Sequence, residues 1–241
     1  MTLENRPTES RLPAGDDPYV WVDDRKMIVS SVGGVMAPGA WIGVHVNAVR
    51  QPIAEEFNFH VEVAEVDGLG RPTSIVQQCS LRMNVSNEPK ELLPVDSHLP
   101  ARAPACYRIK TSITREGFTE TRYAYITVPD QILNAELIPA STNAQPGDRL
   151  DFALVNTGPT DLFFGVDYRL EREDGDTWTG CNVEEAWRLI GLSLEPGGRH
   201  EGHAELPKNP PPGRYRVIKD VSGVGTNLQR TVSFEFHVPP E

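Results

Sequence analysis

The feature that most constrains this chain is an internal repeat, in which the second half matches the first at an offset of about 108 residues. The matches keep the same order along the chain and drift by a single residue. The matched segments are Pro38 and Gly39 with Pro146 and Gly147, residues 57–68 with residues 164–175, and residues 106–110 with residues 214–218. This order predicts one structural module used twice.

Length and local composition divide the chain further. The 241 residues allow two modules that are each long enough to bury a core. Residues 1–18 are polar and rich in proline, so we expect a flexible tail there. The expected organisation is a first domain at residues 19–128, a short linker at residues 129–132 and a second domain at residues 133–238.

The secondary structure pattern is strand after strand. Residues 41–46 and 149–154 alternate apolar with small or polar side chains, and each run follows a Pro-Gly turn. Residues 57–66 and 163–172 follow as aromatic-rich strands, and each module ends in a hairpin. About seven short strands in each module predict an all-β chain of two tandem immunoglobulin-like β-sandwich domains.

Turns and tyrosines refine this expectation. Asp67-Gly68 and Asp174-Gly175 are dipeptides that suit tight hairpins, because glycine accepts a positive φ. Tyr107 and Tyr215 stand near the start of the penultimate strand of each module. We expect both rings to be buried, with each hydroxyl hydrogen-bonded at a corner of the sandwich.

The second half resembles a bacterial immunoglobulin-like domain over residues 133–238. The residues that carry the resemblance are residues 145–148, Asn156, residues 164–171, Gly175, Trp178, residues 194–198 and residues 212–219. The first half is a diverged second copy, related to this family through the internal repeat. The resemblance implies a sandwich fold and a non-catalytic role in binding, spacing or assembly, with no defined ligand. Because such domains are common in cell-envelope and secreted proteins, it allows that location.

Charge and hydropathy exclude some classes of partner. The net charge is −11, and the second module carries most of the excess of acidic residues. Neither half has a basic stripe interleaved with aromatic residues, so we do not expect nucleic acid binding. No segment has the roughly 20 apolar residues of a membrane span, and no secretory signal is recognised. The cytoplasm is therefore the default location, with the compartment left open.

No catalytic, cofactor or metal motif is found, so we do not expect an enzyme. His200 and His203 form a close pair, but three positions apart on one strand they point to opposite faces. Cys79 and Cys106 would close a disulfide loop in an oxidising compartment, or all three cysteines, Cys181 included, are reduced. The spacing fits no zinc pattern.

Two functions from different classes remain. The first is a non-catalytic interaction or structural protein that contacts a protein partner or copies of itself. The second is a carbohydrate-binding or enzyme-accessory module, in which exposed aromatic rings stack on a glycan. Trp41, Trp178 and Trp187 are expected in or against the core, and Trp21 as an exposed contact. The candidate binding residues lie mainly in long connections at residues 33–36, 92–100 and 222–227: Trp21, Gly33, Gly34, His98, Ser222, Gly223, Gly225 and Asn227.

Overall fold

The part of the chain that the computed structural model describes consists of strands joined by turns and loops. The described residues are 15–16, 19–22, 25–48, 53–85, 92–115, 117–145, 147–181 and 190–240, and they contain no helix. Most of the expected tail at residues 1–18, and Trp187, lie outside the described residues. For Trp21 the backbone is described but the side chain is not. The chain divides into unit 1, which ends at Pro129, and unit 2, which begins at Asp130.

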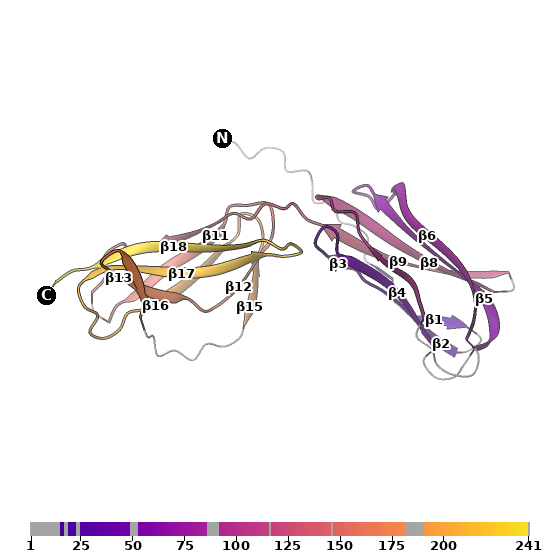
Figure 1. Cartoon of the computed structure of the whole chain (residues 1–241), viewed down its shortest axis with the longest axis horizontal. Helices are drawn as coiled ribbons and strands as arrows, with labels where there is room; N and C mark the ends of the chain where they lie inside the picture. Colours follow the sequence, from indigo (N-terminus) through magenta and orange to yellow (C-terminus); the bar gives the residue numbers. More distant parts are fainter. Residues whose placement is uncertain are drawn as a thin grey trace. The chain divides into compact units, whose positions relative to one another are not determined.

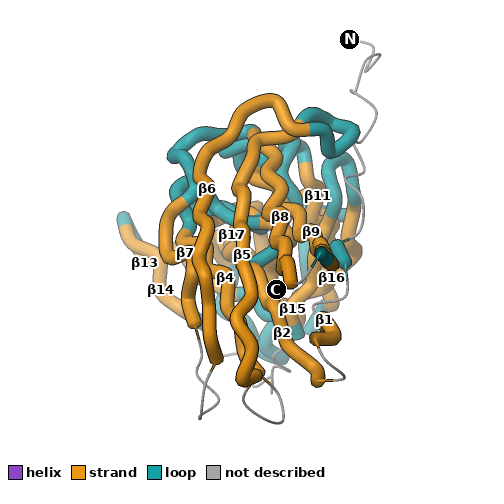
Figure 2. The backbone as a smooth tube through the Cα atoms, turned by 90° about the vertical axis from the view of Figure 1, so that its right-hand side faces the viewer, coloured by secondary structure: helices purple, strands orange, loops and turns teal. Residues whose placement is uncertain are grey.

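Unit 1 has two sheets (Figure 1). The four-stranded sheet has the order β1 (Tyr19–Val22), β2 (Arg25–Ser31), β4 (Trp41–Ala48) and β7 (Leu92–His98). The five-stranded sheet has the order β3 (Gly34–Val35), β9 (Phe118–Val128), β8 (Ala105–Arg115), β5 (Ile53–Val66) and β6 (Pro72–Val85). Figure 2 shows β6, β5, β8 and β9 side by side in this order.

Unit 2 repeats this plan. Its three-stranded sheet has the order β10 (Ala135–Pro139), β11 (Arg149–Asn156) and β16 (Arg199–Glu205). The larger sheet has the order β14 (Thr177–Gly180), β13 (Arg169–Asp174), β17 (Gly213–Gly223), β12 (Leu162–Gly165) and β15 (Gly191–Leu194), and β18 (Gln229–Val238) pairs with β17. The predicted fold class, all-β with tandem sandwiches, is confirmed.

The two units pair their strands in the same way. In unit 1 the hairpin of β8 and β9 binds β5, and in unit 2 the hairpin of β17 and β18 binds β12 and β13. Strand β3 pairs in parallel with β9, and an isolated parallel bridge joins Asn143 to His237 of β18. The segments that match in sequence thus occupy corresponding strands.

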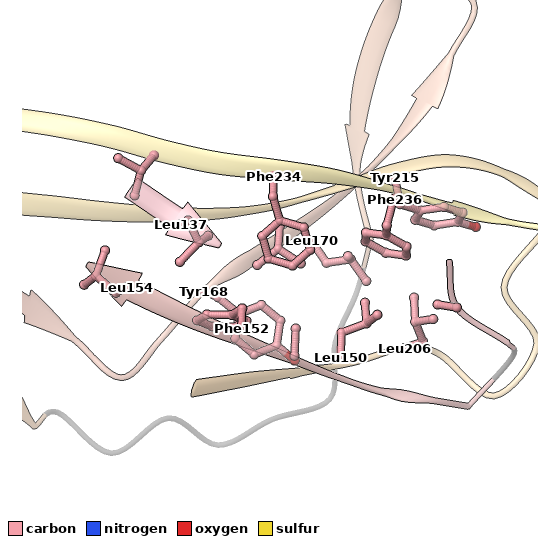
Figure 3. Close-up of a cluster of buried hydrophobic side chains, with 14 of the residues drawn as sticks. Leu137, Leu150, Phe152, Leu154, Tyr168, Leu170, Leu206, Tyr215, Phe234 and Phe236 are labelled. Carbon is pink, nitrogen blue, oxygen red and sulfur yellow. The ribbon is translucent and has the colours of Figure 1, made fainter. Parts of the chain in front are cut away.

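Alternation of side chains gives each unit its own core. Along β18 the buried residues Val232, Phe234, Phe236 and Val238 alternate with exposed ones, as a strand with one covered face requires. Phe236 stacks on Tyr215 with ring centroids 5.5 Å apart (Figure 3). The buried clusters of unit 1 and unit 2 have no residue in common.

The predicted single strand at residues 163–172 is wrong, because the backbone leaves the ladder between β12 and β13. Lys219 is buried at this break, and its Nζ donates to the backbone oxygens of Gly165 at 2.8 Å and of Asp167 at 2.7 Å. The ammonium group thereby provides hydrogen bonds to two backbone carbonyls that lie where the strand pairing is interrupted. In unit 1 the corresponding strand β5 runs on without a break.

One of the two predicted tight turns is confirmed and the other is corrected. Asp174 faces Thr177 across the β13–β14 hairpin, and Gly175 has φ 62°. In unit 1 the positive φ belongs to Gly70 instead of Gly68. The Asp67 carboxylate there accepts hydrogen bonds from the backbone N–H groups of Leu69 and Arg71, which closes a longer loop.

The corner tyrosines differ between the units. Both rings are buried, as predicted. The Tyr215 hydroxyl donates to the backbone oxygen of Pro211 at 2.6 Å, which confirms the predicted corner in unit 2. The Tyr107 hydroxyl is buried and has no hydrogen-bond partner among the described residues, so the corresponding prediction for unit 1 is wrong.

This difference sets up a matched pair of variants. We expect Tyr215→Phe to lower the free energy of unfolding by about 1 kcal/mol, because a buried hydrogen bond is lost. Tyr107→Phe is expected to change it by less than about 0.5 kcal/mol, since the hydroxyl that it removes is unpaired. Urea unfolding of both variants measures the two values. An equal loss in both would contradict the assignment of the corner to Tyr215 alone.

Candidate functional site

Gly34 is the first residue of the short strand β3, and Gly33 directly precedes it. Gly34 has φ 89°, a conformation that favours glycine, and pairs with Ile126 of β9. The backbone N–H of Met36 continues this pairing by donating to the oxygen of Thr127. A shallow hollow of about 330 Å³ opens beside Gly33, Gly34 and Tyr125. Part of the predicted loop at residues 33–36 is therefore a strand.

The predicted loop at residues 92–100 is wrong for most of its length, because Leu92–His98 forms strand β7. His98 is its last residue and is exposed, directly opposite Trp41 of β4. After His98, the backbone N–H of Leu99 donates to the oxygen of Ala40, and Gly39 donates to Pro100. The ends of β7 and of the Pro38-Gly39 turn thus lie together.

The remaining candidates form the tip of the β17–β18 hairpin in unit 2. Ser222 and Gly223 end β17, and Gly225 has φ 67° in the turn. The Thr226 hydroxyl donates to the Gly223 oxygen at 2.8 Å and accepts from the Leu228 N–H at 3.1 Å. Asn227 is exposed in this closed turn. The candidates are thus divided between two units, Gly33, Gly34 and His98 in one and the hairpin tip in the other.

Trp41 was expected in or against the core and is instead a surface residue, with 39% of its area exposed. Its six-membered ring lies over Gly43, where a Cβ would stand 2.3 Å from Cη2 of the ring. The indole N–H donates to the Asp96 carboxylate, and the His45 ring meets the indole edge-on at 6.2 Å. Trp41, His45, Asp96 and His98 form an aromatic and polar patch on β4 and β7, called here the Trp41 patch.

Trp178 in unit 2 does not offer a comparable surface. The Arg216 guanidinium lies over its ring at 4.3 Å from the centroid, and Arg214 lies at 5.9 Å. The same arginines pair with carboxylates of neighbouring strands, Arg216 with Glu171 at 2.5 Å and Arg214 with Glu173 at 3.1 Å. The acidic residues of this sheet are therefore partly neutralised by a cross-strand ladder of ion pairs.

The feature that the sequence reasoning missed is strand β6. It is 14 residues long and, among the described strands, hydrogen-bonds only with β5, so it is an open edge of the five-stranded sheet. Between Pro72 and Val85 its sole charged residue is Arg82. Residues 77–84 pair with β5 in an unbroken register, and bulges interrupt the ladder only outside this stretch.

The other described edges carry features that discourage pairing with another strand. Strands β1, β14 and β15 have only four residues each, and β3 has two. Because β3 pairs with β9 only at Ile126 and Thr127, the rest of β9 is also an edge, and it carries Glu120 and Arg122. Strand β7 carries Pro94 and Asp96, β10 carries Glu136 and Pro139, β16 carries Arg199, Glu201 and Glu205, and β18 carries Arg230 and Glu235. Short length, proline and charge are the usual protections of sheet edges. Strand β6 lacks all three over residues 77–81.

Apolar side chains gather at this edge. Leu69, in the turn before β6, is 70% exposed, and Ile75, Val76 and Leu81 are 58%, 38% and 41% exposed. Leu81 lies opposite Phe59, which is buried in the core, so the two side chains share the inner face of the sheet. The apolar face of the sheet thus continues to its open edge without being fully covered.

Of the two alternatives for the cysteines, the structure supports the reduced state. All three cysteines are free, and β5 lies between β6, which holds Cys79, and β8, which holds Cys106. Two strand spacings, roughly 9.5 Å, exceed the Cα separation that a disulfide spans.

His200 and His203 also separate, as predicted. His200 packs on Phe164 with centroids 5.1 Å apart, whereas His203 is exposed. Within the described residues, His, Cys, Asp and Glu side chains form no group of three that could hold a metal ion. Likewise, no helix in this part of the chain has the length and hydropathy of a membrane span.

We expect His200 to make the stability of unit 2 depend on pH. Burial lowers the pKa of His200 below 6.5, and the charge of Lys219 lowers it further. The unfolded chain therefore binds a proton more readily than the folded one, so the free energy of unfolding falls as the pH drops through about 6.5. We expect His200→Gln to flatten this dependence in urea unfolding between pH 5 and pH 8. His203→Gln, at an exposed position of the same strand, is the control, and equal slopes for both variants would contradict this role of His200.

The comparisons with known proteins bear on unit 2. Residues 137–237 match the model of the bacterial Ig-like domain, which confirms the resemblance of the second half. A comparison with curated proteins found no match.

Solved structures match the chain only distantly. Red sea bream transglutaminase matches with a TM-score of 0.38 and 12% identity, over 92% of this chain and 32% of that one. Escherichia coli alpha-2-macroglobulin activated by porcine elastase gives 0.35 and 13%, over 89% and 22%. Salmonella alpha-2-macroglobulin reacted with methylamine gives 0.33 and 15%, over 90% and 16%. The chain spans about a third or less of the length of these proteins.

Proposed function

We propose that this chain is a non-catalytic interaction module that works through protein–protein contacts, with the open edge at β6 as its contact surface. The Ig-like match of residues 137–237 supports a non-catalytic module in general terms. The observation that carries the contact surface is the 14-residue edge strand with one charged residue. An unpaired edge of this kind presents a row of backbone donors and acceptors to any extended partner strand.

Side chains add selectivity to this edge. Of the large hydrophobic residues exposed in the described part of unit 1, Leu69, Ile75, Val76 and Leu81 belong to β6 or its preceding turn. An added strand would cover Leu81, which lies on the inner face of the sheet beside the buried Phe59. Since residues 77–81 carry no charge, the preferred partner strand is itself uncharged and apolar on one face.

Site-specific photocrosslinking in the cells that naturally produce the chain tests this function. A benzophenone side chain at Gln78, which is exposed in β6, should form covalent adducts with a protein partner. The matched control carries the same group at Ser193, exposed on edge strand β15 of unit 2, and should give at least tenfold less. Absence of adducts at Gln78, or equal yields at both positions, would overturn the proposal.

The Trp41 patch favours a second candidate, binding of a carbohydrate. The Trp41 ring rests on the Gly43 backbone and is 39% exposed, with Asp96 and His98 beside it as polar groups. Rigid aromatic surface with a few oriented polar groups is the usual make-up of a small-molecule site. Phe163 in unit 2 lies over Gly191 in a similar way, 49% exposed, but near a different set of residues.

Those two aromatic residues provide the test of glycan binding. If the patch binds a glycan, Trp41→Ala should weaken binding at least tenfold in titration calorimetry with soluble polysaccharides, because the stacking surface is lost. Phe163→Ala should leave the affinity unchanged. No binding by the unmodified chain to any polysaccharide of a broad panel, or equal effects of both variants, would exclude this second function.

A further inference from the structure

We propose that the partner of β6 is β6 of a second copy of this chain, paired antiparallel about a two-fold axis at Cys79 or Ser80. This inference rests on the proposed function, because it names the partner of the same edge. In such a dimer the five-stranded sheet of unit 1 continues into that of the other copy. The interface is isologous, so the same patch serves both copies.

Charge is the first argument for a second copy. Residues 77–81, the sequence Gln-Gln-Cys-Ser-Leu, are uncharged, so the strand that pairs with them must also avoid unpaired charge. This stretch meets that condition itself. Arg82 is the one charge of β6, and it already forms an ion pair with Glu56 of β5.

The position of Arg82 limits the register. A two-fold axis normal to an antiparallel pair passes between two copies of the same residue. With the axis at Cys79 or Ser80, the two Arg82 positions lie six or four residues apart along the ladder, at least roughly 13 Å. That distance exceeds the screening length of about 8 Å at physiological salt. An axis at Leu81 would bring the two arginines close together, so we exclude it.

The pairing also completes the inner face of the sheet. Gln77, Cys79 and Leu81 lie opposite Val63, Val61 and Phe59, which are all buried. An axis at Cys79 places Leu81 against Gln77 of the second copy, and an axis at Ser80 places Leu81 against its Cys79. In both registers the partner strand covers Leu81, which is 41% exposed in the single chain. The inner faces of the two sheets then lie on the same side of the joined sheet, so their side chains are neighbours.

The regular part of β6 is long enough for this contact. Residues 77–84 hold an unbroken register with β5, so their backbone is extended and free of bulges. The bulge at Val76, which has no partner in β5, interrupts the ladder on one side. The paired segment is therefore short, and we expect a reversible dimer with a dissociation constant in roughly the micromolar range.

Analytical ultracentrifugation of the full chain from about 1 to 200 μM tests the dimer. The unmodified chain should show a concentration-dependent dimer under reducing conditions. Gln78→Lys should reduce the dimer fraction at least tenfold, because the new ammonium group would meet a like charge in either register. With the axis at Ser80 it would lie opposite Arg82 of the second copy, and with the axis at Cys79 it would lie diagonally across from the new lysine of the second copy. Gln78 is exposed, so the variant should unfold at the same temperature as the unmodified chain.

The matched control is Gln229→Lys, the same substitution at an exposed position of β18 in unit 2, and it should dimerise like the unmodified chain. A chain that stays monomeric over the whole range would overturn the proposal. A Gln78→Lys variant that dimerises normally would also overturn it, because the contact would then lie elsewhere.

Cysteine crosslinking locates the axis. In a background with Cys79, Cys106 and Cys181 changed to serine, single cysteines are placed at positions 79, 80 and 193 and oxidised with diamide. Residues directly opposite in an antiparallel pair have Cα atoms about 4.5 to 5.5 Å apart, within reach of a disulfide. We expect covalent dimers to form at least tenfold faster at position 79 or 80 than at position 193. Equal rates at the three positions would contradict the pairing.

The photocrosslinking experiment separates this inference from the function on which it rests. An adduct at position 78 with twice the mass of the chain supports the second copy as partner. An adduct with another protein keeps the proposed function and overturns the self-pairing. No adduct overturns the proposed function, whatever the centrifuge shows for the purified chain.

Discussion

Backbone pairing along one long hairpin organises each unit. In unit 1, β8 and β9 are paired from Ala105–Val128 to Arg115–Phe118, and in unit 2, β17 and β18 are paired from Gly213–Val238 to Ser222–Gln229. Strand β5 in unit 1, and β12 and β13 in unit 2, pair with the first strand of this hairpin, and the alternate side chains of the hairpin supply much of the buried cluster. Because every buried N–H and C=O group needs a partner, each strand added to this hairpin must pair on its far side as well or remain an edge of the sheet.

Local sequence patterns predicted the parts of the fold that depend on neighbouring residues. Period-two alternation predicted the strands around residues 41–46 and 149–154, and an Asp-Gly dipeptide predicted the turn at Gly175. The repeat predicted corresponding strands. These features are local because side-chain alternation and turn geometry are set within a few residues.

Features that depend on distant residues were not predictable in this way. Strand β12 ends because Lys219, more than fifty residues further on, binds the carbonyls of the break. The connection predicted at residues 92–100 is mostly the edge strand β7, where proline, here Pro94, is tolerated. Spacing along the chain could not decide between a Cys79–Cys106 disulfide and reduced cysteines, because it does not reveal that β5 lies between the two strands. The open edge at β6 was missed for the same reason, although the run of 14 residues with one charge was visible in the sequence.

The distribution of protected and unprotected edges determines the valence of this chain. Assembly into filaments needs two complementary surfaces on each subunit, so that every added copy leaves a new one open. Among the described strands, β6 is the edge strand with an uncharged, proline-free run at residues 77–81, whereas the other edges are short or carry proline or charge. In the dimer proposed above, one such edge on each chain would allow each chain to pair with one other. When this edge pairs with the same edge of a second copy, both edges become paired, so the assembly would end at a dimer.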